Sequence, residues 1–240
     1  MKRHCKFYCF RNTRESNKKL IEKTEKIELV IFDMDGVLTD ILSSWKHIHD
    51  YFNTSNERSV NAYLKGKFDD AEFIRRDAAL WQKDGKPVKR EKIVEILSEV
   101  PLMKGARECI NSLKKKGIKT AIISAGLDIL AERVAKELEI DYVYSNGIKS
   151  DNQGYLNGEA IVGVKLSNKD QTVEELSNRL NIPLSKIAAV GNSCFDIPMF
   201  EVSGLGIAFN PEDECVKEAA DLIVDGKDVS KILTALNGYI

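Results

Sequence analysis

The 240-residue sequence predicts an α/β fold: a Rossmann-like three-layer core around a parallel sheet, with a small helical cap inserted after the first strand. Short apolar, β-branched runs alternate with helical patterns, which indicates βαβ units whose sheet is covered on both faces. A long helical stretch interrupts this alternation directly after the first run. Hydrophobic residues make up 43% of the chain, enough to bury the core of such a fold.

The core elements follow one another in a regular order. The expected strands are ELVIF (28–32), GIKTAIISAG (117–126), DYVYSN (141–146), KIAAVGN (186–192), GLGIAFN (204–210) and DLIVD (221–225). The helical patterns between them are ARECINSLKKKG (106–117), LDILAERVAKELEI (127–140), KDQTVEELSNRL (169–180), FDIPMFEVSG (195–204) and DECVKEAA (213–220). Between about 147 and 163, glycines and an Asp-Asn pair favour a β-hairpin instead of a helix.

The segment 41–103 has apolar residues at three- and four-residue spacing, which predicts helices. The helical stretches are SSWKHIHDYF, DDAEFIRRDAALWQKDG and KREKIVEILSEV. An insertion after the first strand lies over the edge where open α/β sheets bind ligands, so we interpret it as a cap. The domain prediction is a basic extension over 1–26, a core over 27–42 and 101–240, and a helical cap over 43–100.

Composition excludes several classes of protein. The net charge of −1 gives no general attraction to nucleic acid, and no apolar run approaches the roughly 20 residues that span a membrane. The first 26 residues hold nine Lys or Arg against three Glu, so this arm leaves some room for RNA or an anionic surface. Five scattered cysteines favour reduced thiols and a cytoplasmic location. The oligomeric state is left open.

Polar residues that could take part in catalysis follow the predicted strands. Asp33 and Asp35 end the first strand, Ser124 ends the second, and Asn192 and Asp196 follow a later one. The carboxyl ends of parallel strands converge on one crevice. Lys169 begins the helix before the last of these strands. We therefore expect one site.

Adjacent carboxylates repel each other by about 4 kcal/mol at 4 Å with an effective dielectric near 20, so a cation among them or a shared proton is expected. Oxygen ligands suit Mg²⁺, which commonly meets phosphate in proteins. One carboxylate then attacks phosphorus to form an aspartyl-phosphate, and the other moves protons. Ser124 and the amides of the SAGL segment, Ala125 included, suit the phosphoryl oxygens, and Lys169 offsets charge.

FDMDGVLTD, IISAG, Lys169 in LSNKDQTVEEL and AVGNSCFDIPMF resemble, in order, four motifs of the haloacid dehalogenase superfamily, in its phosphoserine-phosphatase-type branch. The resemblance covers about residues 27–238. It implies Asp33 as nucleophile and Asp35 as general acid/base that also offers its backbone carbonyl to Mg²⁺. It further implies that Ser124 binds phosphate and that Lys169 stabilises charge. Asn192 and Asp196 take the metal-site positions.

Two departures from the family pattern bear on function. Asn192 replaces an Asp in the metal loop, which removes one negative charge and predicts weaker Mg²⁺ binding. In the cap, Leu42 stands where the family has a Glu, and Asp77 stands near the Arg that grips the carboxylate of phosphoserine, with Arg75 and Arg76 just before it. Phosphoserine is thus in doubt, and another small phosphorylated metabolite is expected.

Other readings stay open at this point. The Asp pair also fits strand-end caps, Lys165 competes with Lys169, and His47 and His49 fit surface or packing roles. The leading interpretation is a Mg²⁺-dependent phosphomonoester phosphatase. A phosphomutase of the same superfamily, or a phosphate-binding regulatory protein with weakened catalysis, is the alternative.

Overall fold

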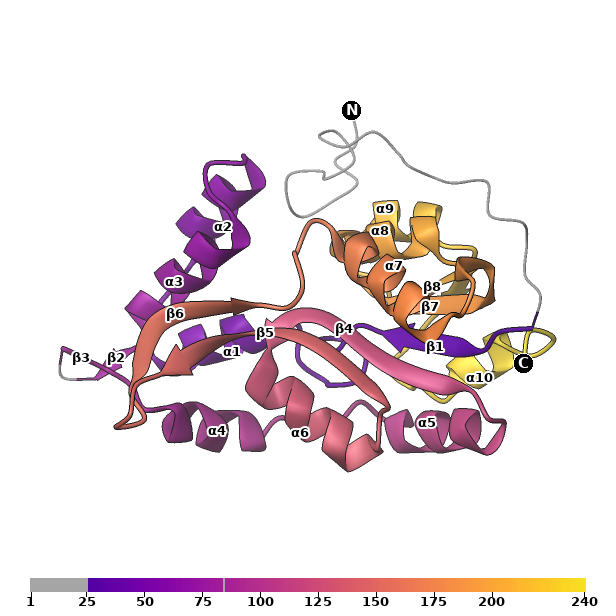
Figure 1. Cartoon of the computed structure of the whole chain (residues 1–240), viewed down its shortest axis with the longest axis horizontal. Helices are drawn as coiled ribbons and strands as arrows, with labels where there is room; N and C mark the ends of the chain where they lie inside the picture. Colours follow the sequence, from indigo (N-terminus) through magenta and orange to yellow (C-terminus); the bar gives the residue numbers. More distant parts are fainter. Residues whose placement is uncertain (1–25, 84) are drawn as a thin grey trace.

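The computed structural model describes residues 26–83 and 85–240, so the predicted basic extension lies outside the described residues except for Lys26. One seven-stranded sheet forms the middle layer, in the order β6-β5-β4-β1-β7-β8-β9 (Figure 1). Its strands are β1 (Leu29–Phe32), β4 (Lys119–Leu127), β5 (Tyr142–Ser150), β6 (Leu156–Val162), β7 (Ile187–Gly191), β8 (Leu205–Phe209) and β9 (Leu222–Val224). All neighbouring strands are parallel except β5 and β6, which form the predicted antiparallel hairpin.

β1 lies at the centre of the sheet, and all four of its residues are buried. Ile31 pairs with Ala121 of β4 on one side and with Ala189 of β7 on the other. Alternate residues point to opposite faces, so Val30 packs in one core cluster and its neighbour Ile31 in the other. Such double burial explains the continuous apolar run that ends at Asp33.

Helices cover both faces of the sheet and complete the three layers (Figure 1). The core helices are α5 (Ala106–Lys115), α6 (Asp128–Leu138), α7 (Lys169–Leu180), α8 (Ile197–Val202), α9 (Glu214–Ala219) and α10 (Lys231–Ala235). Helices α5, α6 and α10 pack in one cluster, and α7, α8 and α9 in the other. The α/β prediction is confirmed, and α10 is the core helix that the sequence pattern did not indicate.

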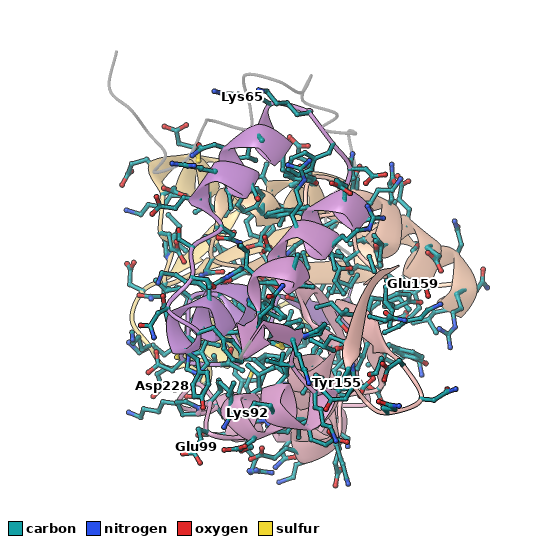
Figure 2. All side chains as sticks on the ribbon, turned by 90° about the vertical axis from the view of Figure 1, so that its left-hand side faces the viewer. Lys65, Lys92, Glu99, Tyr155, Glu159 and Asp228 are labelled. Atoms are coloured by element: carbon teal, nitrogen blue, oxygen red, sulfur yellow. The ribbon has the colours of Figure 1, made fainter. Side chains whose placement is uncertain are left out.

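The insertion after β1 holds four helices and a small strand pair. Its elements are α1 (Ser44–Tyr51), α2 (Glu57–Leu64), α3 (Asp70–Leu80), β2 (Gln82–Lys83), β3 (Lys86–Pro87) and α4 (Arg90–Ser98). Neither α2 nor the β2–β3 pair was expected. Figure 2 views the molecule from this side, with Lys65 after α2 near one extreme and Lys92 of α4 towards the other. The boundaries 43 and 100 stay a prediction.

Helices α3 and α4 both attach the insertion to the core. Helix α3 packs along β6, so the β5–β6 hairpin supports it (Figure 1). Helix α4 packs against α6, and the guanidinium of Arg90 lies 3.2 Å from Asp128 Oδ2 at the start of α6. The backbone N–H of Arg90 also donates to Gly154 O (2.9 Å) in the turn of the hairpin.

The structure bears on two expectations from composition, the state of the cysteines and the lack of a membrane span. Cys109, Cys194 and Cys215 are buried thiols, whereas Cys5 and Cys9 lie outside the described residues. Among the helices that the structure describes, none combines the length and the apolar character of a membrane span. The cytoplasmic location stays a prediction.

Candidate active site

One cavity of about 810 Å³ lies at the carboxyl edge of the sheet, between the core and helices α1–α3. The predicted site residues that line it are Asp33, Asp35, Ser124, Ala125, Lys169 and Asn192. Asp196 is fully buried and contacts both Lys169 and Asn192. Residues 163 positions apart in the sequence thus share one site, as expected where parallel strands end together.

Asp33 is the first residue after β1. Its Oδ1 accepts a hydrogen bond from the N–H of Met34 (2.8 Å) and lies 3.1 Å from Lys169 Nζ. Burial raises the pKa of the Asp33 carboxyl to about 7; Lys169 opposes this rise, and the charges of Asp196 and Asp35 add to it. Lys169 therefore neutralises the acidic cluster only in part, a condition that favours a bound cation.

Asp35 is held by the first residue of α1. Its Oδ2 accepts hydrogen bonds from the N–H (2.7 Å) and the hydroxyl (2.8 Å) of Ser44. Its Oδ1 is buried and has no hydrogen-bond partner among the described residues. Burial raises the pKa of Asp35, against the hydrogen bonds from Ser44, which lower it. A carboxyl with a raised pKa is suited to hold and deliver a proton.

Lys169 is the first residue of α7 and is 2% exposed. Its Nζ donates to Asp196 Oδ1 (2.7 Å) and faces Asp33. Burial lowers the pKa of Lys169, but the carboxylates of Asp196 and Asp33 outweigh it and hold the pKa above its ordinary value. Asp196 Oδ2 accepts from the N–H groups of Asn192 (2.9 Å) and Ser193 (3.0 Å). Asp196 therefore joins the lysine to the loop after β7.

Asn192 lies against the turn after β1. Its side chain packs on Gly36, whose φ of +77° and missing Cβ allow this close approach. Its Nδ2 donates to Glu212 Oε1 (3.0 Å). Glu212 lines the same cavity, so a carboxylate is present next to the position where the sequence carries an amide.

The oxygen atoms here fit a hard divalent cation. They include the carboxylates of Asp33 and Asp35, one of whose oxygens has no hydrogen-bond partner within the described part of the chain, and the amide of Asn192. In the described ranges, no three His, Cys, Asp or Glu side chains form a group that could hold a metal by themselves. Amide or backbone oxygens are thus needed, and Mg²⁺ accepts them more readily than softer metals do.

The carboxyl-terminal end of β4, the strand next to β1, contains the predicted phosphate segment. Ser124 is buried, and its Oγ accepts a hydrogen bond from the N–H of Gly126 (3.2 Å). The backbone carbonyl of Ala125 accepts one from Trp45 Nε1 (2.9 Å) on α1. The predicted phosphate segment is therefore fastened to the first helix of the insertion.

The cap positions that departed from the family pattern are both placed at the cavity. Leu42 is 65% exposed, and Asp77 is 2% exposed. Arg75 and Arg76 turn outward and pair with Glu72 on the surface of α3. Neither arginine is among the residues that line the cavity.

The structure also bears on the alternatives that the sequence left open. Lys165 is exposed and binds Gln171 Oε1 (3.2 Å), whereas Lys169 reaches the acids. His49 is buried and contacts Trp81, in line with the packing role expected of it, but it also lines the cavity.

Sequence reasoning missed two residues of the site. Ser44 had a usable signal, because the Ser-Ser-Trp start of a helix after the Asp pair places a hydroxyl near those acids. Glu212 had none, because its contact with Asn192 joins two separate loops.

Comparison with known proteins adds to this geometry. The family model of haloacid dehalogenase-like hydrolases matches residues 27–204. The phosphoserine phosphatase of Archaeoglobus fulgidus is 34% identical over 200 residues, which are 80% of this chain and 55% of that protein. This chain therefore spans about half the length of that relative. The phosphoserine phosphatase of Lactococcus lactis is 33% identical over 175 residues, 72% of this chain and 77% of that protein.

Solved structures agree with the sequence matches. A substrate-bound phosphoserine phosphatase complex superposes with a TM-score of 0.74 at 27% identity, over 88% of this chain and 99% of that one. A phospho-aspartyl intermediate analogue of phosphoserine phosphatase has the same TM-score at 28% identity, over 88% of this chain and 99% of that one.

Proposed function

This chain belongs to the haloacid dehalogenase-like hydrolases and is a phosphatase of that family, and from this we propose that it hydrolyses a small phosphomonoester through an aspartyl-phosphate on Asp33. The observation that carries the proposal is the buried group of Asp33, Asp35 and Lys169 at one end of the cavity. Nucleophile, proton carrier and counter-charge are all within it.

In the first half-reaction, a carboxylate oxygen of Asp33 attacks phosphorus. The bond between phosphorus and the substrate oxygen breaks, and Asp35 gives its proton to the departing alcohol. The raised pKa of Asp35 supports its protonated form at this stage. Lys169, 3.1 Å from Asp33, stabilises the negative charge that passes between the nucleophile and the phosphoryl group.

In the second half-reaction, water attacks the phosphorus of the aspartyl-phosphate. Asp35 takes the proton of this water, the carboxylate of Asp33 is released, and inorganic phosphate leaves. Ser124 and the backbone around Ala125 bind the phosphoryl oxygens throughout. The bond from Trp45 to Ala125 keeps this segment in place.

We propose Mg²⁺ as the cofactor, held by Asp33, the backbone carbonyl of Asp35 and Asn192. When bound, it neutralises carboxylate and phosphoryl charge. Asp196 was predicted at a metal-site position, and this stays a prediction. Because both its oxygens already bind Lys169 and the loop amides, we favour a positioning role for it.

The test is release of inorganic phosphate from an aryl phosphate and a panel of phosphomonoesters, with and without Mg²⁺. Asp33→Asn removes the nucleophile and is expected to reduce kcat by at least about a thousandfold. Asp40→Asn is the matched control, since Asp40 is an exposed residue that pairs with Lys227. No release by the folded wild-type protein, or equal loss in both variants, would contradict the proposal.

A further inference from the structure

The cap half of the cavity contains a buried carboxylate with an incomplete set of partners. Asp77 of α3 is 2% exposed and lines the cavity. Its Oδ2 accepts a hydrogen bond from Asn56 Nδ2 (2.6 Å), but its Oδ1 has no partner among the described residues. A buried carboxylate oxygen without a partner is costly, so such an atom beside a cavity suggests a ligand that completes it.

His49 is the other neighbour of Asp77, and its Nδ1 lies within hydrogen-bond distance of Trp81 Nε1 and of Thr54 Oγ1 (2.8 Å). Trp81 Nε1–H donates to His49 Nδ1 (3.1 Å), so Nδ1 is an acceptor and Nε2 carries the proton. Nε2 faces Asp77 Oδ2 at 3.4 Å. Asn56 therefore donates a hydrogen bond to Asp77, whereas His49 Nε2 faces the same oxygen without forming a hydrogen bond within the described part of the chain.

Within residues 26–83 and 85–240, the other ionisable residues do not supply the missing positive charge. Lys46 lines the cavity but pairs with Asp50 (2.6 Å). Arg75 and Arg76, next to Asp77 in the sequence, bind Glu72 on the outside of α3. Two further acids of the cap, Glu57 and Asp70, line the same cavity. The cap half of the cavity is thus acidic, whereas Lys169 lies at the end where the phosphate is expected.

We propose that Asp77, supported by His49 and Asn56, binds the ammonium group of the substrate, and that the substrate is a phosphorylated amino alcohol without a carboxylate. The inference rests on the proposed phosphatase function. A substrate ammonium supplies the charge and the hydrogen bond that Asp77 Oδ1 lacks. A substrate carboxylate would meet Asp77 where a cation is needed, so phosphoserine is a poor substrate despite its amine.

The test compares pairs of substrates that differ only at the distal end. Aminoalkyl phosphates of two to five carbons are assayed beside hydroxyalkyl phosphates of equal length. At the best length, the wild-type enzyme is expected to prefer the amine by at least tenfold in kcat/KM, and Asp77→Asn reduces this ratio to about one. Asp50→Asn removes a carboxylate from the same cavity, where it is paired with Lys46, and is expected to keep the ratio.

Three outcomes overturn the inference: equal kcat/KM for amine and hydroxyl substrates, a preference that survives in Asp77→Asn, or phosphoserine as the best substrate. The wild-type comparison stands even where Asp77→Asn fails to fold. Hydrolysis of an aryl phosphate, which has no amine, tests the phosphatase function separately. Where that hydrolysis is absent, calorimetric binding of the same pairs decides: tenfold tighter binding of the amine supports the inference, and equal binding overturns it.

Discussion

Asp33 and Asp35 are two residues apart and similarly buried, yet their neighbours prepare them for different chemistry. Asp33 faces the ammonium group of Lys169, whereas Asp35 accepts two hydrogen bonds from Ser44. An ammonium favours the ionised carboxylate that a nucleophile needs. Burial raises the pKa of Asp35 against the hydrogen bonds from Ser44, so this carboxyl can keep a proton. Asp196 maintains this difference, because it accepts a hydrogen bond from Lys169 Nζ and so holds the lysine beside Asp33.

At Asn192, a single side chain sets the charge of the proposed metal site. Asn192→Asp adds a carboxylate, and we expect Mg²⁺ to bind roughly tenfold tighter, a gain of about 1.4 kcal/mol. Without metal, the same change replaces the hydrogen bond to Glu212 by a repulsion between carboxylates, so the melting temperature falls.

Calorimetric titration of the metal-free protein with Mg²⁺ measures the affinity, and thermal unfolding measures the cost. Asn61→Asp, which adds the same charge on α2 in the cap half of the cavity, is the matched control. It should change neither the Mg²⁺ affinity nor the melting temperature strongly. Equal Mg²⁺ affinity in wild type and Asn192→Asp would contradict the assignment of Asn192 to the metal site.

Among the elements, helix α1 links the cap to the chemistry. Its first residue, Ser44, holds Asp35 and also accepts a hydrogen bond from the N–H of Leu127 (2.9 Å), and Trp45 holds the carbonyl of Ala125. One turn later, His49 faces the cap half of the cavity. A movement of α1 would therefore disturb the acid/base residue and the phosphate segment together.

Helix α4 fastens the other end of the insertion through Arg90 and Asp128. Both side chains are largely buried, so the pair is worth more than a surface ion pair. We expect Arg90→Ala to lower the free energy of unfolding by about 1–2 kcal/mol. Arg75→Ala, which breaks an exposed pair with Glu72 on α3, should cost less than about 0.5 kcal/mol. Urea denaturation of both variants measures the difference, and equal losses would contradict it.

The elements also show what could be predicted from the sequence. β1 and α7 follow from local patterns: an apolar run buried on both faces, and a helix whose pattern begins at Lys169 as the helix itself does. The β2–β3 pair has two residues in each strand, too few for any periodic signal. The network of His49, Trp81 and Asp77 could not be predicted, because it depends on how two cap helices pack.

At the scale of the whole molecule, the buried charges of the site oppose the stability of the fold that contains them. Asp33, Asp35 and Asp196 are buried together, and Lys169 pairs with Asp33 and Asp196. A cluster of this kind is retained for function and weakens the protein when no cation or substrate is bound. Burial of the apolar clusters on both faces of the sheet offsets this loss of stability.

This opposition predicts how the stability of the metal-free protein depends on pH. The pKa of Asp33 is raised from 3.8 to about 7 by burial, so the folded state holds this proton more tightly than the unfolded chain. The contribution is fully present below about pH 4 and is lost as the pH rises through about 7, with an upper limit of about 4 kcal/mol. Asp33→Asn cannot release a proton here, so its stability should fall less across this window. Denaturant unfolding at several pH values between 4 and 8 measures the difference in stability between the two proteins. Mg²⁺ added at pH 8 should stabilise the wild type more than it stabilises Asp33→Asn. Parallel curves for the wild type and Asp33→Asn would show that Asp33 does not carry the raised pKa.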